Sequence, residues 1–516
     1  MRPAAGAALA AGALGAAGAA WVAARAGGEP YMDEVRPAPP PAAPPVPAAP
    51  PPPRRARGLA LAPFFLCGSQ GCLPACPGSL LTGRGRPAPG AAQVFHVPQA
   101  RHYCAGEWEV WDSKITTFPG IYVAAAVAGR ALAPLGFEAC SLAQLRALGV
   151  VFLAGSCALL AGVLRELHGP AAAPAGATAL QALALSLFPL HLFYAHLYYT
   201  DVPAVFFLLL CYYLCLRGRG WASALAGAGA VLMRQTNAVW VVFVLCVGVH
   251  RTLRPAGGGH KRESPPRALP GVFPEARDLL RAAWARRGDL VRRFGALALV
   301  PAGFALFVVR NGGVAVGDKD AHRPVLHFAQ LLYFCSCSLG FLAPLLPDPL
   351  LNTLRAAAAA PRGRSVLAAG ALCTACLLAA HRSTLVHPYI LADNRHSTFY
   401  LWRHLLGRGP WVRYALVPGH ALAAAAVGRW ASAEAPPLVA LAWALATAAT
   451  LVPAHLVELR YFNVPFLLLC AHGPPWAPAQ SARAALAFLG AHLAALYVFL
   501  ERPFRWPDGS TARFMW

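Results

Sequence analysis

Two acidic residues directly follow the first apolar run of the sequence. Asp33 and Glu34 close the stretch 29–34, which comes after an apolar segment at residues 4–25. A carboxylate at a membrane surface can take a proton from a hydroxyl group and stabilise positive charge on a reacting carbon. Either residue is therefore a candidate general base. An acid pair at a helix end, solvated at the membrane interface, explains the same spacing equally well.

A second group of polar and aromatic residues leads into the next apolar run. Trp111, Asp112 and Lys114 lie in the stretch 108–120. A tryptophan ring can stack on a sugar face, while the neighbouring charged groups bind hydroxyls, so we interpret these three residues as a candidate sugar-binding site. The alternative is a belt of aromatic residues at the level of the lipid headgroups.

The third group, residues 387–398, contains many hydrogen-bond donors between two apolar segments. Arg395 can contact phosphate oxygens with two parallel hydrogen bonds, and His396 or His387 can add a further donor. Such a set can offset the charge of a departing lipid phosphate. A solvated, weakly ordered loop is the alternative, but it is hard to reconcile with the aromatic residues Tyr389 and Tyr400.

Four further charged residues lie within or beside apolar runs: Asp201, Arg234, Glu458 and Arg460. Ionisable groups at membrane depth are costly and are by default functional or paired. For Glu458 and Arg460, a structural salt bridge is as good an explanation as a contact with substrate.

The composition decides what kind of protein must position these groups. Of the 516 residues, 57% are hydrophobic and 13% are charged, about half the charged fraction of a soluble protein. The formal charge of +23 comes from arginines grouped between apolar runs, which fits the positive-inside rule of membrane proteins. A nucleic-acid interface would instead show one basic stripe, so we expect no nucleic-acid partner.

The apolar runs predict an all-α polytopic membrane protein with about 11 to 14 transmembrane helices. The basic segment 251–293 is predicted to be cytosolic, which places the N-terminus in the cytosol and most polar groups in the lumen. A cleaved signal peptide is the alternative for the first run. The predicted organisation is a first transmembrane helix at 1–25, a lumenal loop at 26–115, transmembrane helices at 116–250, the cytosolic loop at 251–293, transmembrane helices at 294–500 with lumenal loops at 311–324 and 382–396, and a C-terminal tail at 501–516.

Within the first lumenal loop, residues 36–93 change to Pro, Ala and Arg and show no folding periodicity. We predict a disordered insertion here, since the flanks at 31–35 and 95–100 would otherwise form one continuous element. The spacing of Cys67, Cys72 and Cys76 is close to that of metal ligands, but a metal knuckle is the weaker interpretation.

Other cysteines lie inside apolar runs, where they are interpreted as small hydrophobic residues. These are Cys157, Cys211, Cys246 and Cys470. The pair Cys373 and Cys376 has no histidine partners, so we expect no metal site and no cofactor. The sequence shows no Gly-rich phosphate loop and no nucleophile elbow. A lipid-bound donor substrate fits better than a nucleotide sugar, because no cytosolic segment is long enough for a nucleotide-binding fold.

Several motifs together resemble the eukaryotic dolichyl-phosphate-glucose-dependent alpha-1,2-glucosyltransferases, and the resemblance spans most of the chain. The residues that carry it are Glu29 to Glu34, Phe95 to Ala100, Tyr103 with Cys104, Trp111 with Asp112, Lys114 to Thr117, Arg234 to Asn237, Leu326 to Phe328, His387, Ala392 to His396, Arg460 to Phe462 and Arg513 to Trp516.

The resemblance implies the multispanning fold of integral-membrane glycosyltransferases (GT-C type) in the endoplasmic reticulum membrane, with a lumenal active site and a metal-independent, inverting mechanism. It implies dolichyl beta-glucosyl phosphate as donor and a diglucosylated dolichyl-diphosphate oligosaccharide as acceptor, joined by an alpha-1,2 bond in the N-glycosylation pathway. By position, Asp33 becomes the general base with Glu34 as second choice, and Arg395, His396 and Arg460 become donor-phosphate ligands. The alternative is a polytopic transporter or channel-associated regulatory protein, although no internal repeat is visible.

Overall fold

The computed structural model describes residues 95–516 apart from 173, 255–271, 320–322, 347 and 506–510, and only Ala10, Ala11 and Ala13 before them. In this part the chain is helical, with two strands of two residues each at its end. The elements are α2 (His96–Ala105), α3 (Gly120–Leu132), η1 (Ala133–Leu135), α4 (Leu142–Ala172), α5 (Ala175–Ser186), α6 (Pro189–Ala195), α7 (Asp201–Leu216), α8 (Gly220–Met233), α9 (Asn237–Leu253), α10 (Val272–Ala285), α11 (Arg287–Asn311), α12 (Ala329–Phe341), η3 (Ala343–Leu345), α13 (Asp348–Ala359), α14 (Arg362–Ser383), α15 (Pro388–Ala392), α16 (Ser397–His404), η4 (Leu406–Arg408), α17 (Pro410–Ala415), α18 (Val417–Ala431), α19 (Pro437–Leu451), η5 (Leu459–Phe462), α20 (Asn463–His472), α21 (Pro478–Glu501), β1 (Phe504–Arg505) and β2 (Thr511–Ala512).

The predicted all-α membrane class is confirmed by the lengths and composition of these helices. Among the described residues, α4, α11, α14 and α21 are each long and apolar enough to cross a membrane. The pair α5 and α6, bent by 68°, makes up to five. Six further apolar helices are shorter, at 10–17 residues. The figure of 11 to 14 crossings stays a prediction.

Small residues let α4 pack closely against the end of α6 and against α7, which runs in the same direction as α4. A Cβ atom added at Gly149 would lie 2.4 Å from the carbonyl oxygen of Ala195, just before α7. One added at Gly155 would lie 2.5 Å from the ring of Phe206. Glycine is the residue type that lets membrane helices approach this closely. The start of α7 therefore lies beside the first half of α4, nearer to the beginning of α4 than to its end.

This parallel packing gives the bundle two chemically different ends. At the start of α4, Cys140 forms a disulfide with Cys104 of α2. Near the other end of α4, Glu166 accepts a hydrogen bond of 3.0 Å from Arg217, which follows α7. The carbonyl oxygen of Glu166 also accepts a bond of 2.8 Å from Arg251. One end thus carries a disulfide and the other is rich in arginine.

The disulfide was not predicted, whereas four cysteines inside the apolar runs behave as expected. Cys157, Cys211, Cys246 and Cys470 are free thiols in the structure. Cys67, Cys72 and Cys76 lie outside the described residues, as do the predicted insertion 36–93 and nearly all of the predicted first transmembrane helix.

The predicted loops contain short regular elements. The basic segment 251–293 includes all of α10 and the start of α11. In the predicted lumenal loop 311–324, the backbone N–H groups of Val316 and Asp318 donate to the carbonyls of Thr116 and Ser113, at 3.0 and 3.1 Å. This loop is thereby held against the chain that leads into α3.

We predict that Gly149→Ala destabilises the protein, because the added methyl group meets a backbone carbonyl that cannot move aside. Overpacking of this kind costs about 1–3 kcal/mol, so the thermal unfolding midpoint in detergent should fall. Gly303→Ala is the matched control, since a Cβ atom at this helical position of α11 has no neighbour within 4 Å. Equal midpoints for the two variants would contradict the close packing of α4 against the end of α6.

Candidate active site

A short turn before α16 holds a tightly bonded carboxylate. Asp393 accepts two side-chain hydrogen bonds from the guanidinium of Arg395, at 2.9 and 2.8 Å, and one from the backbone N–H of Arg395 at 3.0 Å. His396 Nε2 lies 3.4 Å from the same carboxylate. Arg395 is buried, with only 3% of its surface exposed. Asp393 therefore fixes both the arginine and the histidine.

These contacts change the protonation of the two titratable partners. Burial raises the pKa of Asp393, but the bonds and charges of His396 and Arg395 outweigh it and hold the pKa well below its usual range. Burial lowers the pKa of His396, but the bond to Asp393 and the charges of Asp393 and Glu458 leave it above its ordinary value. The environment thus favours a protonated His396 beside an ionised Asp393.

A second group of charges lies next to the first. Arg460 is bonded to Glu458, and its guanidinium also lies 3.9 Å from Asp201. Arg234, between α8 and α9, is bonded to the other oxygen of Asp201. The charge of His396 acts on Glu458, which connects the two groups. Burial raises the pKa of Glu458, but the charge and hydrogen bond of Arg460 outweigh it and leave the pKa lowered.

Aromatic rings surround the arginines of this second group. The guanidinium of Arg460 lies 5.3 Å from the ring centre of Tyr199 and 5.7 Å from that of Tyr461. Arg234 lies 5.4 Å from the ring centre of Tyr461. These are cation–π distances, which keep a cation at low exposure without a further carboxylate. The hydroxyl of Tyr199 is buried and has no hydrogen-bond partner among the described residues.

Helix α2 also contributes a residue to this cluster. His96, at the start of α2, lies with its ring 5.7 Å from Tyr199 and bonds through Nδ1 to the hydroxyl of Tyr122. Burial and, to a smaller extent, the charge of Arg460 lower the pKa of His96 to about 4. A neutral His96 therefore faces the cluster from the segment that follows Asp33 and Glu34 in the sequence.

The C-terminal residues Met515 and Trp516 contact Arg395 and His396 of the cluster. The backbone N–H of Met515 donates to the carbonyl of Arg395 at 2.8 Å, and the two segments form a parallel bridge at His396. His396 Nδ1 lies 3.2 Å from the carbonyl oxygen of Trp516. Because a protonated imidazole donates from both nitrogens, this carbonyl also favours the charged form.

A buried cluster of this kind, at the disulfide-bearing end of a membrane bundle, is a candidate active site. The model of the DIE2/ALG10 family matches residues 88–471. The chain belongs to the DIE2/ALG10 family. No solved structure matches it.

The family members to which the chain is similar include proteins of plants and animals. Each is named as Dol-P-Glc:Glc(2)Man(9)GlcNAc(2)-PP-Dol alpha-1,2-glucosyltransferase. The Arabidopsis thaliana protein is 31% identical over 85% of this chain and 97% of its own length. The Mus musculus protein is 32% identical over 82% of this chain and 92% of its own length. The Drosophila melanogaster protein is 33% identical over 82% of this chain and 93% of its own length. The resemblance seen in the motifs is thus confirmed.

In this member of the DIE2/ALG10 family, the structure brings three predicted site residues together. Arg395, His396 and Arg460 lie in the cluster just described. His387 packs edge-on against His455, with ring centres 4.7 Å apart. Asp33 and Glu34 lie outside the described residues.

The three predicted sugar-binding residues are divided between two places. Trp111 packs edge-on against Tyr122, 5.9 Å between ring centres, and so lies beside the partner of His96. The backbone N–H of Asp112 donates to Gln99 at 2.9 Å, and its carboxylate accepts from the N–H of Lys114. The amino group of Lys114 lies 3.6 Å from Asp318 and is well exposed. Only Trp111 is thus linked to the cluster by the contacts described here.

The site contains residues to which the sequence assigned no role. Asp393 stands in the predicted donor-rich stretch, but its part in holding Arg395 and His396 was missed. Asp201 was noted as a buried charge without a partner being named. The sequence feature that could have identified them is that acidic residues are rare in apolar segments. This feature marks such a residue as paired or functional, but it does not identify the partner.

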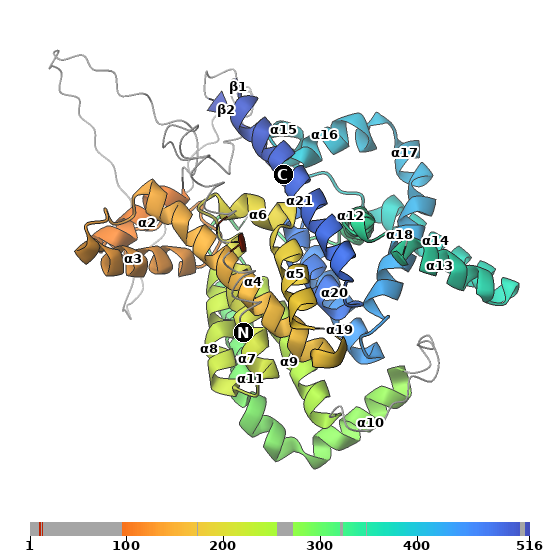
Figure 1. The fold of residues 1–516 in the computed structure, drawn as a ribbon. Helices are drawn as coiled ribbons and strands as arrows, with labels where there is room; N and C mark the ends of the chain where they lie inside the picture. Colours follow the sequence, from red (N-terminus) through yellow and green to blue (C-terminus); the bar gives the residue numbers. More distant parts are fainter. Residues whose placement is uncertain are drawn as a thin grey trace, which may run out of the picture. The chain divides into compact units, whose positions relative to one another are not determined.

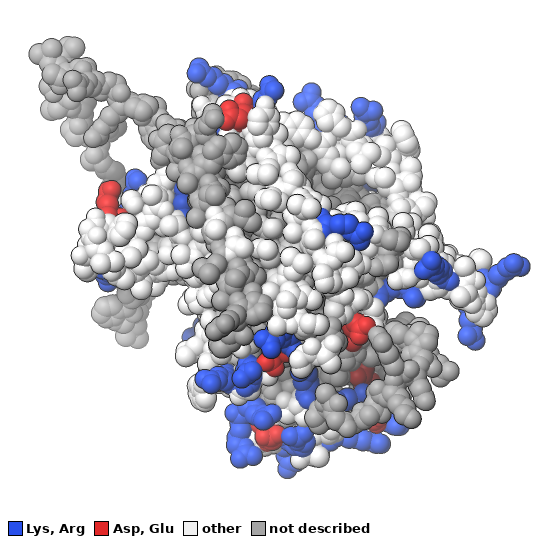
Figure 2. All heavy atoms as spheres, in the orientation of Figure 1, with Lys and Arg blue, Asp and Glu red and all other residues white. Residues whose placement is uncertain are grey.

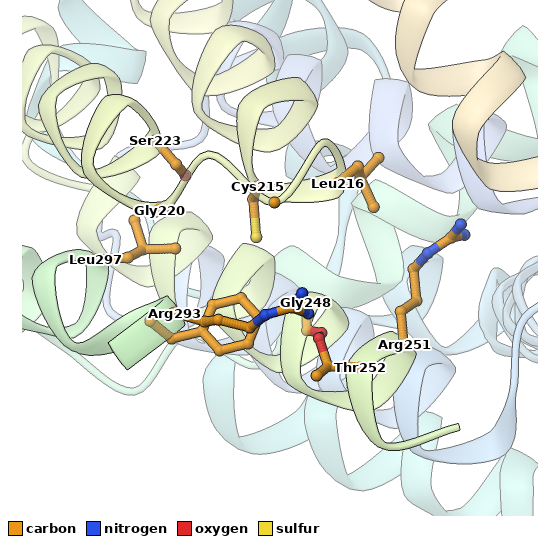
Figure 3. Close-up of a pocket in the computed structure, with 11 residues that line it drawn as sticks. Cys215, Leu216, Gly220, Ser223, Gly248, Arg251, Thr252, Arg293 and Leu297 are labelled. Carbon is orange, nitrogen blue, oxygen red and sulfur yellow. The ribbon is translucent and has the colours of Figure 1, made fainter. Parts of the chain in front are cut away.

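A cavity of about 250 Å³ lies elsewhere, between the turn from α7 to α8 and the helices α9 and α11 (Figure 3). Arg251 and Arg293 line it, at the arginine-rich end. The hydroxyls of Ser223 and Thr252 donate to backbone carbonyls, and Arg251 donates to that of Glu166. Its polar lining is therefore largely satisfied, and none of the predicted site residues lines it.

No group of three or more His, Cys, Asp or Glu among the described residues is arranged to hold a metal ion. The chemistry that the cluster itself offers is electrostatic. Its arginines and its protonated histidine can receive an anionic group.

We predict that the contribution of His396 to stability falls as the pH rises above about 6.5, the ordinary pKa of histidine. A histidine whose pKa is raised above the ordinary 6.5 stabilises the fold fully below that value and loses this contribution as the pH passes its folded-state pKa. His396→Gln should flatten this part of the curve of thermal midpoint against pH. His404→Gln, an exposed histidine of α16, is the control and should keep the slope. Identical curves for wild type and His396→Gln would exclude a charged His396.

Proposed function

We propose that this chain is a glucosyltransferase that moves glucose from dolichyl beta-glucosyl phosphate to the terminal glucose of a diglucosylated dolichyl-diphosphate oligosaccharide. The product carries an alpha-1,2 linkage, and the reaction belongs to the N-glycosylation pathway of the endoplasmic reticulum. The support is membership in the DIE2/ALG10 family together with the activity named for the relatives. Those names give no support to the alternative of a transporter or channel-associated protein.

The structural observation that carries the proposal is the balance of charge in the cluster. Within the described part of the chain, the cluster brings together four cationic groups, counting a protonated His396, and three carboxylates. The cations are Arg234, Arg395, Arg460 and His396, and the carboxylates are Asp201, Asp393 and Glu458. Phosphate oxygens bind best to such pre-organised donors.

Within this cluster the cations have different parts. Arg460 and His396, exposed by 22% and 16% at their side chains, are the proposed contacts of the donor phosphate. Arg395 uses its guanidinium to hold Asp393, so we assign it mainly to positioning His396. We assign Trp111 to stacking on a sugar ring, with Asp112, Lys114 and His387 as outer contacts of the two substrates.

The reaction is a single displacement. The 2-hydroxyl oxygen of the acceptor glucose attacks C1 of the donor glucose, and the bond from C1 to the phosphate oxygen breaks. The acceptor proton goes to Asp33, or to Glu34 as second choice, and dolichyl phosphate leaves with its electron pair against Arg460 and His396. Attack from the face opposite the phosphate converts the beta configuration to alpha without a covalent intermediate.

We place this site in the lumen of the endoplasmic reticulum. Disulfides persist in oxidising compartments, and Cys104–Cys140 lies at the end of α4 that is nearer to Asp201. The arginines at the other end follow the positive-inside rule for a cytosolic surface. The two independent signals agree on the orientation.

We predict that Asp33→Asn abolishes glucose transfer from a synthetic dolichyl-type glucosyl phosphate to a diglucosylated lipid-linked acceptor. Loss of a general base lowers the rate about 10²–10⁴-fold. Glu34→Gln, the matched neighbour, should keep most of the rate. If Glu34→Gln is the inactive variant, the base is Glu34. If both variants are as active as wild type, neither carboxylate is the base.

We also predict that Arg460→Gln lowers kcat/KM for the donor about 10- to 100-fold, since a hydrogen bond to a charged group is worth about 1.5–3 kcal/mol. Arg310→Gln, at an exposed position near the end of α11, is the control and should leave the rate unchanged. The phosphate assignment is wrong if Arg460→Gln changes the KM of the acceptor and leaves that of the donor unaltered.

A further inference from the structure

Helix α10 exposes an unusual set of large apolar side chains. Phe273, Leu280 and Trp284 are exposed by 79%, 71% and 73%. Spacings of seven and four residues place the three on one face of a helix. Such a face is costly in water, so something apolar must cover it.

The opposite face of α10 is fixed to the bundle by one buried acid. Glu275 is 6% exposed, and one of its oxygens lies 3.0 Å from His250 and 3.2 Å from Arg254, both near the end of α9. Its other oxygen accepts from the backbone N–H of Leu438 in α19 at 3.2 Å. The helix is therefore held with Phe273, Leu280 and Trp284 pointing outward.

The position of α10 in the chain places it at a membrane surface. Only Arg286 separates it from α11, which is long and apolar enough to cross the membrane. In Figure 1, α10 extends across the end of the bundle and does not run alongside the apolar helices. An amphipathic helix attached directly to a membrane-crossing helix lies at the level of the lipid headgroups.

The charged residues around the apolar face of α10 are mostly basic. In the stretch 272–293, six exposed arginines outnumber the partly or fully exposed acids Asp278 and Asp289. The arginines are Arg277, Arg281, Arg286, Arg287, Arg292 and Arg293. Figure 2 shows Lys and Arg gathered over this end of the molecule. Basic residues beside an apolar helical face attract anionic lipids.

We propose that α10 is a binding surface for anionic phospholipids of the cytosolic leaflet, the leaflet opposite the disulfide-bearing end. Acyl chains cover Phe273, Leu280 and Trp284, and phosphate groups contact the flanking Arg277 and Arg281. Arg287, whose guanidinium lies 5.0 Å from the ring centre of Trp284, keeps this tryptophan at the boundary between chain and headgroup. This surface is separate from the proposed transfer of glucose and does not depend on it.

The test uses the full-length protein in liposomes of phosphatidylcholine, with or without phosphatidylinositol. Photoreactive benzoylphenylalanine replaces Leu280 or, as the matched control on another face of α10, the 55% exposed Asp278. After irradiation, mass spectrometry of the α10 peptide identifies what is attached. We expect phospholipid on the Leu280 probe, little on the Asp278 probe, and a preference for phosphatidylinositol over phosphatidylcholine.

The double variant Arg277→Gln and Arg281→Gln, in the background of the Leu280 probe, should reduce this preference about fivefold for each arginine removed. An unchanged thermal midpoint will show that it is folded. Equal labelling by the two probes, a peptide of a second copy attached at Leu280, or a preference that survives the double variant would each overturn the proposal.

Discussion

The three buried carboxylates of the charge cluster, Asp201, Asp393 and Glu458, are each held by arginine side chains. An isolated ion in an apolar medium costs several kcal/mol, so a carboxylate can remain there only beside cations. Asp201 meets that requirement through Arg234 and Arg460, which come from two separate segments later in the sequence. These ion pairs bring together the start of α7 with Asp201, the connection between α8 and α9 with Arg234, and the segment before α20 with Arg460.

That arrangement depends on how closely the helices pack. Because Gly155 has no side chain, α7 can pack closely against α4 and run in the same direction. Asp201 in the first turn of α7 thereby lies toward the end of α4 that carries the disulfide. A larger residue at Gly155 would meet the ring of Phe206, push α7 away from α4 and move the charge cluster with it. The packing of the helices therefore determines the geometry of the charge cluster.

The two ends of the bundle use arginine in different ways. At the disulfide-bearing end Arg234 and Arg460 are partly buried, paired with carboxylates and packed against Tyr199 and Tyr461, which fits our proposal that this cluster receives a phosphate. At the other end they are mostly exposed and surround the amphipathic α10, where water and lipid headgroups are their natural partners. In our proposals the same residue type binds a substrate phosphate in one place and lipid headgroups in the other, because burial decides which partners it can reach.

The sequence by itself determined the membrane class, the family and the motifs that contain Arg395, His396 and Arg460. These follow from local properties: apolar length decides whether a helix enters lipid, and a motif is contiguous in the chain. Only the tertiary structure decided that Arg460 reaches Asp201, that Met515 pairs with Arg395, and that Cys104 bonds to Cys140. An apolar run does not specify which neighbour its helix packs against. The partners of buried charges are therefore fixed only when helices distant in the sequence pack together.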